Sequence, residues 1–204
     1  MSQDMAVIAA AQSPTRFTAF DLVVTYADTV RRVVFTPAAF FRQPTPTRRD
    51  TPAVPFAAAS LGISAVLGQA LALAAAETAA DQLVPVIVYE VVAGGLALGA
   101  GAVLLHLLIR AMVRPHAGFR VTLGLLAYCQ VGVLVAWAPG PIGLVAPLAT
   151  LALATVGVRE QHGTTTRRAA VVVLLAAAGL TVLSMLVVVA GLFLDRACCG
   201  VAGG

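Results

Sequence analysis

Five long apolar runs follow one another along the chain, each bounded by a short polar or Pro- and Gly-containing stretch. A helix that spans a bilayer needs about 20 apolar residues, with about 17 as the short limit, and all five runs reach that limit. The pattern therefore predicts an all-α polytopic membrane protein, a bundle of five transmembrane helices. The third and fourth runs are the shortest and are joined by the tight turn "APGPIG", so four spans with one long hairpin are the alternative. The runs are Pro55–Ala76, Val84–Ile109, Val121–Trp137, Ile142–Val158 and Ala169–Leu194.

A different pattern precedes these runs. In "TAFDLVVTYADTVRRVVF", apolar residues recur at helical spacing, and Asp28 stands four residues before Arg32, a favourable pair on the opposite face. The following "FTPAAFFR" puts Pro37 at the first position of a short helix, with Phe40 and Phe41 one turn later. We interpret this region as an N-terminal amphipathic interfacial helix with an aromatic elbow in the headgroup layer. A helix packed on another part of the protein is the alternative. The predicted apolar face consists of Phe20, Val23, Val24, Ala27, Val30 and Val34.

Composition agrees with a membrane protein. Of the 204 residues, 60% are hydrophobic and 11% are charged, about half the charged fraction of a soluble domain. Every basic residue is Arg, which excludes a P-loop lysine and a lysine Schiff base. We divide the chain into a cytosolic N-terminal region (1–52), a transmembrane domain (53–195) and a short extracytoplasmic tail (196–204).

The arginines predict the orientation. With the N-terminus inside and five spans, 12 of the 13 arginines fall on the inner side, and the outer side receives only Arg196. Cytoplasmic loops carry the excess of basic residues in membrane proteins. We therefore expect a multi-pass protein of the cell (plasma) membrane with a cytoplasmic N-terminus and an extracytoplasmic C-terminus. The inner arginines are Arg16, Arg31, Arg32, Arg42, Arg48, Arg49, Arg110, Arg114, Arg120, Arg159, Arg167 and Arg168.

Two ionisable residues bracket the second apolar run. Glu90 lies near its outer end, where it is either interfacial or a functional intramembrane carboxylate. His106 lies at the inner rim, where packing against a neighbouring loop and a role as a proton relay are the two interpretations. The two residues are 16 positions apart, about 24 Å along a helix, so they do not form a catalytic pair.

Small residues and one polar loop supply the remaining candidates. Gly95 and Gly99 form a GxxxG on the second run, and Gly124 and Gly132 mark a second small-residue face on the third. Such faces let helices approach closely, within one bundle or between two copies of the chain. The loop "VREQHGTTTRR" can cap the fifth span through its threonines and face the anionic inner leaflet through its arginines. A docking surface for a partner or lipid is the second interpretation, with Arg159, Glu160 and His162 as its candidate polar residues.

The sequence lacks the common catalytic, metal-binding and nucleotide-binding motifs. It has no HExxH, GxSxG or CxxC, no carboxylates at metal spacing, and no GxGxxG followed by an acidic residue. We therefore expect no catalytic residue, no bound cofactor or metal, and no nucleic-acid partner.

The ordered set "FTPAAFFR", "LLHLLIR", "FRVTLGLLAYCQVGVL", "WAPGPIGLVAPL" and "GVREQHGTTTRRAAVVVLL" resembles the prokaryotic branch of the Yip1 domain family. The resemblance covers about residues 30–175 and implies a five-helix bundle with a cytosolic N-terminus. Eukaryotic members are membrane adaptors linked to vesicle traffic and small GTPases, whereas a prokaryotic chain would lack that machinery. The positions that match the family pattern are Pro37, Phe40, Phe41, His106, Tyr128, Gly157, Glu160, His162 and Gly163.

Two hypotheses of different classes follow. The first is a non-enzymatic membrane protein that acts as an adaptor, scaffold or accessory subunit for a membrane partner, a second copy of itself or the local lipid. The second is a small transporter or channel that uses Glu90.

Overall fold

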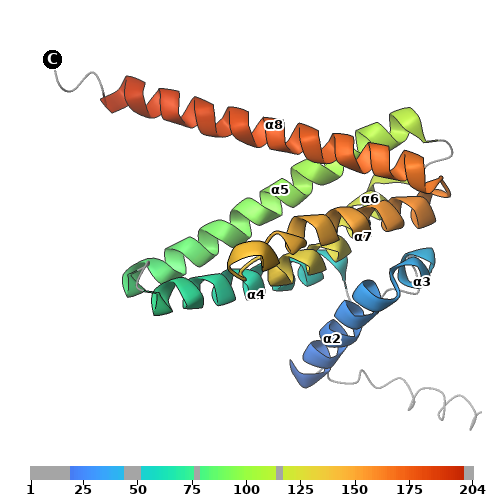
Figure 1. Cartoon of the computed structure of the whole chain (residues 1–204), viewed down its shortest axis with the longest axis horizontal. Helices are drawn as coiled ribbons and strands as arrows, with labels where there is room; N and C mark the ends of the chain where they lie inside the picture. The colour runs from blue at the N-terminus through green and yellow to red at the C-terminus, as the bar shows by residue number, and fades with distance from the viewer. Residues whose placement is uncertain (1–18, 44–51, 76–78, 114–116, 200–204) are drawn as a thin grey trace, which may run out of the picture.

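The computed structural model describes residues 19–43, 52–75, 79–113 and 117–199, and these residues form helices joined by short turns (Figure 1). Two helices precede the transmembrane domain and the others build it. The elements are α2 (Ala19–Phe35), α3 (Pro37–Arg42), α4 (Ala53–Ala74), η2 (Ala80–Gln82), α5 (Leu83–Met112), α6 (Phe119–Cys129), η3 (Gln130–Val135), η4 (Gly140–Ile142), α7 (Val145–His162) and α8 (Thr166–Cys199).

Four helices in the described part of the chain, α4, α5, α7 and α8, are long and apolar enough to cross a membrane. The third predicted span differs, because an α-helix of 11 residues, α6, continues as six residues of 3-10 helix, η3. At about 1.5 and 2.0 Å per residue the two extend over about 28 Å, close to the thickness of the hydrocarbon core. Five spans therefore stay a prediction, and the membrane-protein bundle itself is supported.

The 3-10 segment has side-chain partners for its backbone. The Ser64 hydroxyl donates to the carbonyl oxygen of Val133 at 2.8 Å, and the Trp137 indole N–H donates to the carbonyl oxygen of Leu134 at 2.7 Å. Irregular backbone inside a membrane protein persists where neighbouring groups satisfy it. Ser64 thereby fixes α4 against η3.

One end of the bundle collects the ends of several helices. The Ala117 amide donates to Nδ1 of His162 at 3.1 Å, so α6 starts beside the point where α7 ends and α8 begins. Figure 1 shows the C-terminal end of α5 and the helix α3 at this same side of the bundle. The hydroxyl of Thr165 accepts a hydrogen bond from the Arg168 amide at 3.4 Å and thereby caps α8. This is the cap that the sequence predicted from the threonines of the loop.

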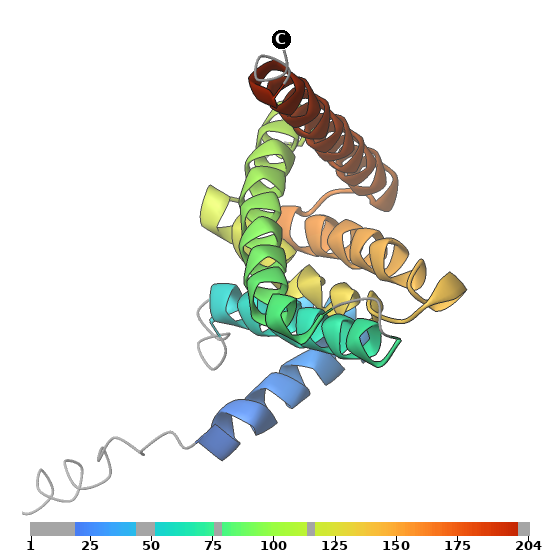
Figure 2. The same cartoon turned by 90° about the vertical axis from the view of Figure 1, so that its left-hand side faces the viewer.

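Helix α2 packs on the bundle with a face that shares only Val30, among the described side chains, with the apolar face predicted from the periodicity. Thr29 and Val33 are buried, and Tyr26 stacks at 5.0 Å from Phe56 of α4. Val23, Val24 and the other exposed members of the predicted apolar face lie beside this packed face and point away from the protein. Both views show the N-terminal end of α2 leading away from the other helices (Figure 2).

The last helix extends well beyond its neighbours. α8 continues to Cys199, so residues 196–199 of the expected tail belong to the helix. The tail residues 200–204 lie outside the described part. Residues 181–191 of α8 are all exposed, so this stretch of the helix extends beyond the packed part of the bundle.

Candidate functional site

A polar cluster joins the N-terminal region to the end of α7. Glu160 accepts hydrogen bonds from Nε of Arg42 and from Nε of Arg159, both at 3.0 Å. Arg159 also donates to the hydroxyl of Thr166 at 3.4 Å, where α8 begins. We call Arg42, Arg159, Glu160 and Thr166 the polar cluster; it holds α3, α7 and α8 together at the end of the bundle.

Electrostatics in the polar cluster favour the ionised carboxylate. The Glu160 side chain is 11% exposed, whereas that of Arg42 is 72% exposed. The apolar stretch of α7 ends at Val158, so Glu160 lies in the polar last turn of the helix. The hydrogen bond from Arg42, followed by the one from Arg159, holds the pKa of Glu160 below its ordinary value.

A second contact fixes the same two elements through the backbone. Nε2 of Gln161 donates to the carbonyl oxygen of Phe41 at 2.6 Å. This carbonyl lies in the last turn of α3, where a helix leaves its carbonyl groups without an intrahelical partner. The sequence reasoning missed both Arg42 and Gln161 as contacts, because each interacts with an element more than a hundred positions away.

The aromatic elbow is placed differently from the prediction. We expected Phe40 and Phe41 to be interfacial, but they are only 7% and 1% exposed and lie in the protein core. Phe40 stacks edge-on against Phe41 at 5.3 Å and against Tyr128 of α6 at 5.0 Å. Pro37 does begin α3, as predicted, and Thr36 precedes it, although the Thr36 hydroxyl donates back to the carbonyl oxygen of Arg32. The two rings are hydrophobic anchors for α3 and not a membrane contact.

An aromatic chain continues from this elbow to α2. Phe56 lies 5.3 Å from Tyr128 and 5.0 Å from Tyr26. The Ser60 hydroxyl donates to the carbonyl oxygen of Phe56 at 3.0 Å, so the Tyr26 hydroxyl is the donor in its 2.9 Å bond to Ser60. Burial raises the pKa of Tyr26. The phenol therefore anchors α2 as a neutral donor.

Glu90 and His106 lie in separate environments. Glu90 is exposed near the start of α5 and accepts from Nε2 of Gln69 at 2.8 Å. His106 places Nδ1 3.2 Å from the buried Thr122 hydroxyl of α6, and its ring meets Phe119 edge-on at 5.6 Å. Both of these contacts of His106 are to α6, and its packing against a neighbouring loop stays a prediction.

The predicted packing glycines divide into two groups. A methyl group added at Gly132 would lie 3.0 Å from the carbonyl oxygen of Ala146 and 3.0 Å from the amide nitrogen of Thr150, so η3 and α7 approach closely there. Gly124 has ordinary contact with Ala53 at 3.8 Å. A methyl group at Gly95 or Gly99 would meet nothing within 4 Å, so the GxxxG is not a close contact inside one copy of the chain. The sequence pattern missed Gly157, where an added methyl group would lie 2.7 Å from Leu125.

The chemistry available at the polar cluster is ionic and hydrogen-bonding. Among the described residues, no group of three or more His, Cys, Asp or Glu side chains lies close enough to hold a metal ion. Four arginines in terminal turns of helices are exposed: Arg110 at the end of α5, Arg120 at the start of α6, and Arg167 and Arg168 at the start of α8. Exposed arginines of this kind attract an anionic membrane surface.

Comparisons with known proteins give one match. The family model described as Yip1 domain matches residues 31–189, a range that includes the last turn of α2, all of α3 to α7 and most of α8. No curated protein matches the chain, and no solved structure does.

Proposed function

The chain belongs to the Yip1 domain family, and from this premise we propose that it is a non-enzymatic adaptor or accessory subunit for a membrane partner or the local lipid. We place it in the cell membrane, with the polar cluster and the N-terminus at the cytoplasmic face. The polar cluster itself is a structural joint, because its arginines and carboxylate are occupied with one another.

The exposed apolar stripe of α2 carries this proposal. The aromatic chain and the polar cluster fix α2 and α3 on the bundle, yet Phe35 is 78% exposed, and Leu22 and Val23 are more than half exposed. A contiguous exposed apolar surface rimmed by polar residues marks a protein or membrane contact. The stripe consists of Val23, Val24, Val34 and Phe35, with the exposed Ala27 and Arg31 between them on the same side of the helix, whereas the exposed Leu22 lies on another side.

Extraction of the protein from its own membrane in polymer nanodiscs tests the proposal. Mass spectrometry would identify the proteins and lipids that accompany the wild type and the variant Val23→Ser plus Val34→Ser. The double variant Thr25→Ser plus Ala39→Ser is the matched control, since it adds the same number of serines away from the stripe. We expect the first variant to lose a stoichiometric protein or an enriched lipid that the control keeps. A wild-type preparation with bulk lipid alone would overturn the adaptor role.

Transport through Glu90 is the second candidate function. The exposed position of Glu90 and its bond to Gln69 favour an interfacial carboxylate. Transport predicts that Glu90→Gln abolishes a proton or solute flux in liposomes and that Glu90→Asp keeps part of it. Equal fluxes in wild type and Glu90→Gln would exclude it.

A further inference from the structure

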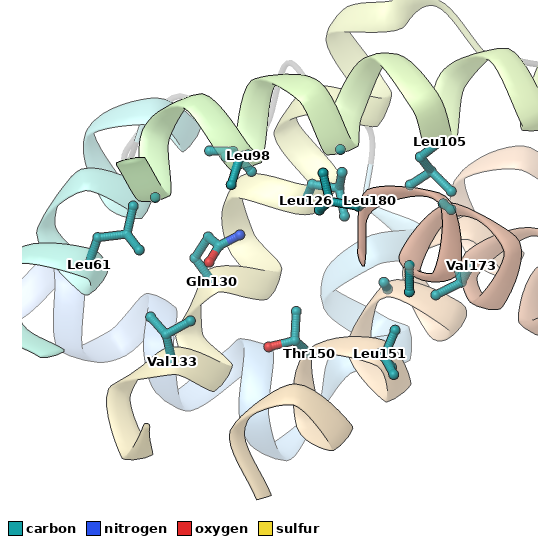
Figure 3. A pocket seen from close by; sticks show the side chains of 16 residues that line it. Leu61, Leu98, Leu105, Leu126, Gln130, Val133, Thr150, Leu151, Val173 and Leu180 are labelled. Carbon is teal, nitrogen blue, oxygen red and sulfur yellow. The ribbon is translucent and has the colours of Figure 1, made fainter. Parts of the chain in front are cut away.

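An apolar cavity of about 330 Å³ lies inside the transmembrane domain (Figure 3). Six elements line it; five of them form a ring, each in contact with the next, in the order α4, α5, α8, α7 and η3, and α6 contributes Leu126. Its size is at the lower end of the range of ligand pockets, about 300–1,000 Å³, and about twice that of an engineered protein cavity that binds benzene. The cavity therefore has room for a segment of a hydrocarbon chain.

The lining is neutral and contains one uncommitted polar group. Among the described residues that line the cavity, none is ionisable. The Thr150 hydroxyl donates to the carbonyl oxygen of Ala146 at 2.9 Å, so it has only acceptor capacity left. The amide of Gln130 has no hydrogen-bond partner among the described residues, and Figure 3 shows it between Leu98 and Leu126 on one side and Val133 and Thr150 on the other.

Because of the position of Gln130, its side-chain amide is in an unfavourable environment, in free-energy terms, when no ligand bonds to it. Gln130 begins η3, 11 residues after α6 starts, which is about 17 Å from that end and near the middle of a hydrocarbon core. An amide without a partner in an apolar environment loses its hydrogen bonds to water and gains none in exchange. The cavity thus offers a donor and an acceptor to a molecule that is otherwise hydrocarbon.

The bilayer itself supplies the route of entry. Leu180 is the last residue of α8 that lines the cavity, and all residues from 181 to 191 are exposed, so the helix leaves the bundle at the margin of the cavity. A lipid chain can enter at this margin from the side without crossing water.

We propose that this cavity binds the chain of an uncharged lipid whose hydroxyl or carbonyl oxygen hydrogen-bonds to the Gln130 amide. The neutral lining excludes phosphate headgroups, because a charge at this depth would have no counter-charge. The inference requires that the bundle is embedded in a membrane with α6 and η3 crossing it; it does not depend on the adaptor role.

Photolabelling in nanodiscs tests the site with a defined probe. Hexadecanol that carries a diazirine on its chain would be compared with phosphatidylcholine that carries the same group on one acyl chain. We expect the alcohol to label residues of the cavity, unlabelled hexadecanol to compete, and the phospholipid to label the outer helix surfaces only. Equal labelling of the cavity by both probes would overturn the preference for a neutral lipid, and labelling outside the cavity by the alcohol would overturn the site.

Variants with matched controls make the test specific. Gly101→Leu adds a side chain beside Leu180 and should reduce cavity labelling at least fivefold, whereas Gly95→Leu on the same helix points into open space and should leave it unchanged. If Gly101→Leu does not fold, Gln130→Met keeps the volume and removes the amide. In that variant, unlabelled hexadecanol should compete less well with the diazirine probe for the cavity, whereas hexadecane should compete as well as in the wild type. An equal loss of competition by both compounds would overturn the role of Gln130.

Discussion

Arg42 and Glu160 are 118 positions apart, yet Nε of Arg42 lies 3.0 Å from Oε2 of Glu160. The contact joins the short helix before the first span to the end of α7. With the bond from Gln161 to the Phe41 carbonyl, it positions the N-terminal arm on the bundle.

Removal of the Arg42–Glu160 ion pair should reduce stability modestly. Arg42 is largely exposed, and exposed ion pairs contribute about 0.2–1 kcal/mol. A double-mutant cycle with Arg42→Gln and Glu160→Gln, followed by thermal unfolding in detergent, should give a coupling energy in that range. Arg167→Gln, an exposed arginine without a role in the polar cluster, should show no coupling to Glu160→Gln. A coupling energy of zero for the Arg42 pair would mean that α3 is held by its aromatic residues and the Gln161 bond without help from the ion pair.

Acidification should weaken the same joint. The folded-state pKa of Glu160 is lowered below 4.5, its ordinary value, by the two guanidinium groups. The stabilisation is therefore complete above the unfolded-state pKa and is lost as the pH falls through the lowered folded-state pKa. Unfolding midpoints measured from pH 7 down to pH 3 should fall more for the wild type than for Glu160→Gln. Parallel pH profiles would contradict the assignment.

The aromatic elbow should be a stability determinant. Phe41→Ala removes a ring that is 1% exposed and should cost about 3–5 kcal/mol, the range for a buried Phe. Phe35→Ala, at a position 78% exposed, should leave the unfolding temperature nearly unchanged. Equal effects of the two substitutions would show that the elbow is not part of the core.

A methyl group at Gly132 should separate η3 from α7. The added carbon would lie 3.0 Å from backbone atoms of Ala146 and Thr150, which cannot rotate away, so we expect a loss of about 1–3 kcal/mol for Gly132→Ala. A methyl group at Gly99 would point into open space. Gly99→Ala should therefore leave the free energy of unfolding unchanged or raise it by up to about 1 kcal/mol, because Ala favours a helix. Thermal unfolding of both variants checks the prediction, and a neutral Gly132→Ala would refute the close approach.

Cysteine labelling should decide between four and five spans. In a background without the native cysteines, a membrane-impermeant maleimide on intact cells should label Asp81→Cys and Pro139→Cys but not Gly118→Cys or Gly163→Cys. Labelling of Gly118→Cys and Pro139→Cys from the same side would mean that α6 and η3 do not cross. Labelling of Gly118→Cys and Gly163→Cys, without labelling of Asp81→Cys and Pro139→Cys, would reverse the predicted orientation of the chain.

Local patterns in the sequence predicted much of the helical structure. Asp28 pairs with Arg32 at 2.7 Å, α3 starts at Pro37 and Thr165 caps α8, because each feature depends on residues within one turn of a helix. The apolar runs also predicted α4, α5, α7 and α8, since the bilayer requires a long apolar helix whatever surrounds it. The interruption at Gln130 was not predictable in this way, because the run around it is uniformly apolar.

The sequence by itself determined the class of protein, the family and the position of the long helices. Only the tertiary structure decided which face of each helix meets protein and which meets lipid. Lipid chains and core side chains are equally apolar, so hydropathy does not distinguish the two environments. For this reason the burial of Phe40 and Phe41, the open space around Gly95 and Gly99, and the cavity beside Gln130 became visible only when the helices were placed together.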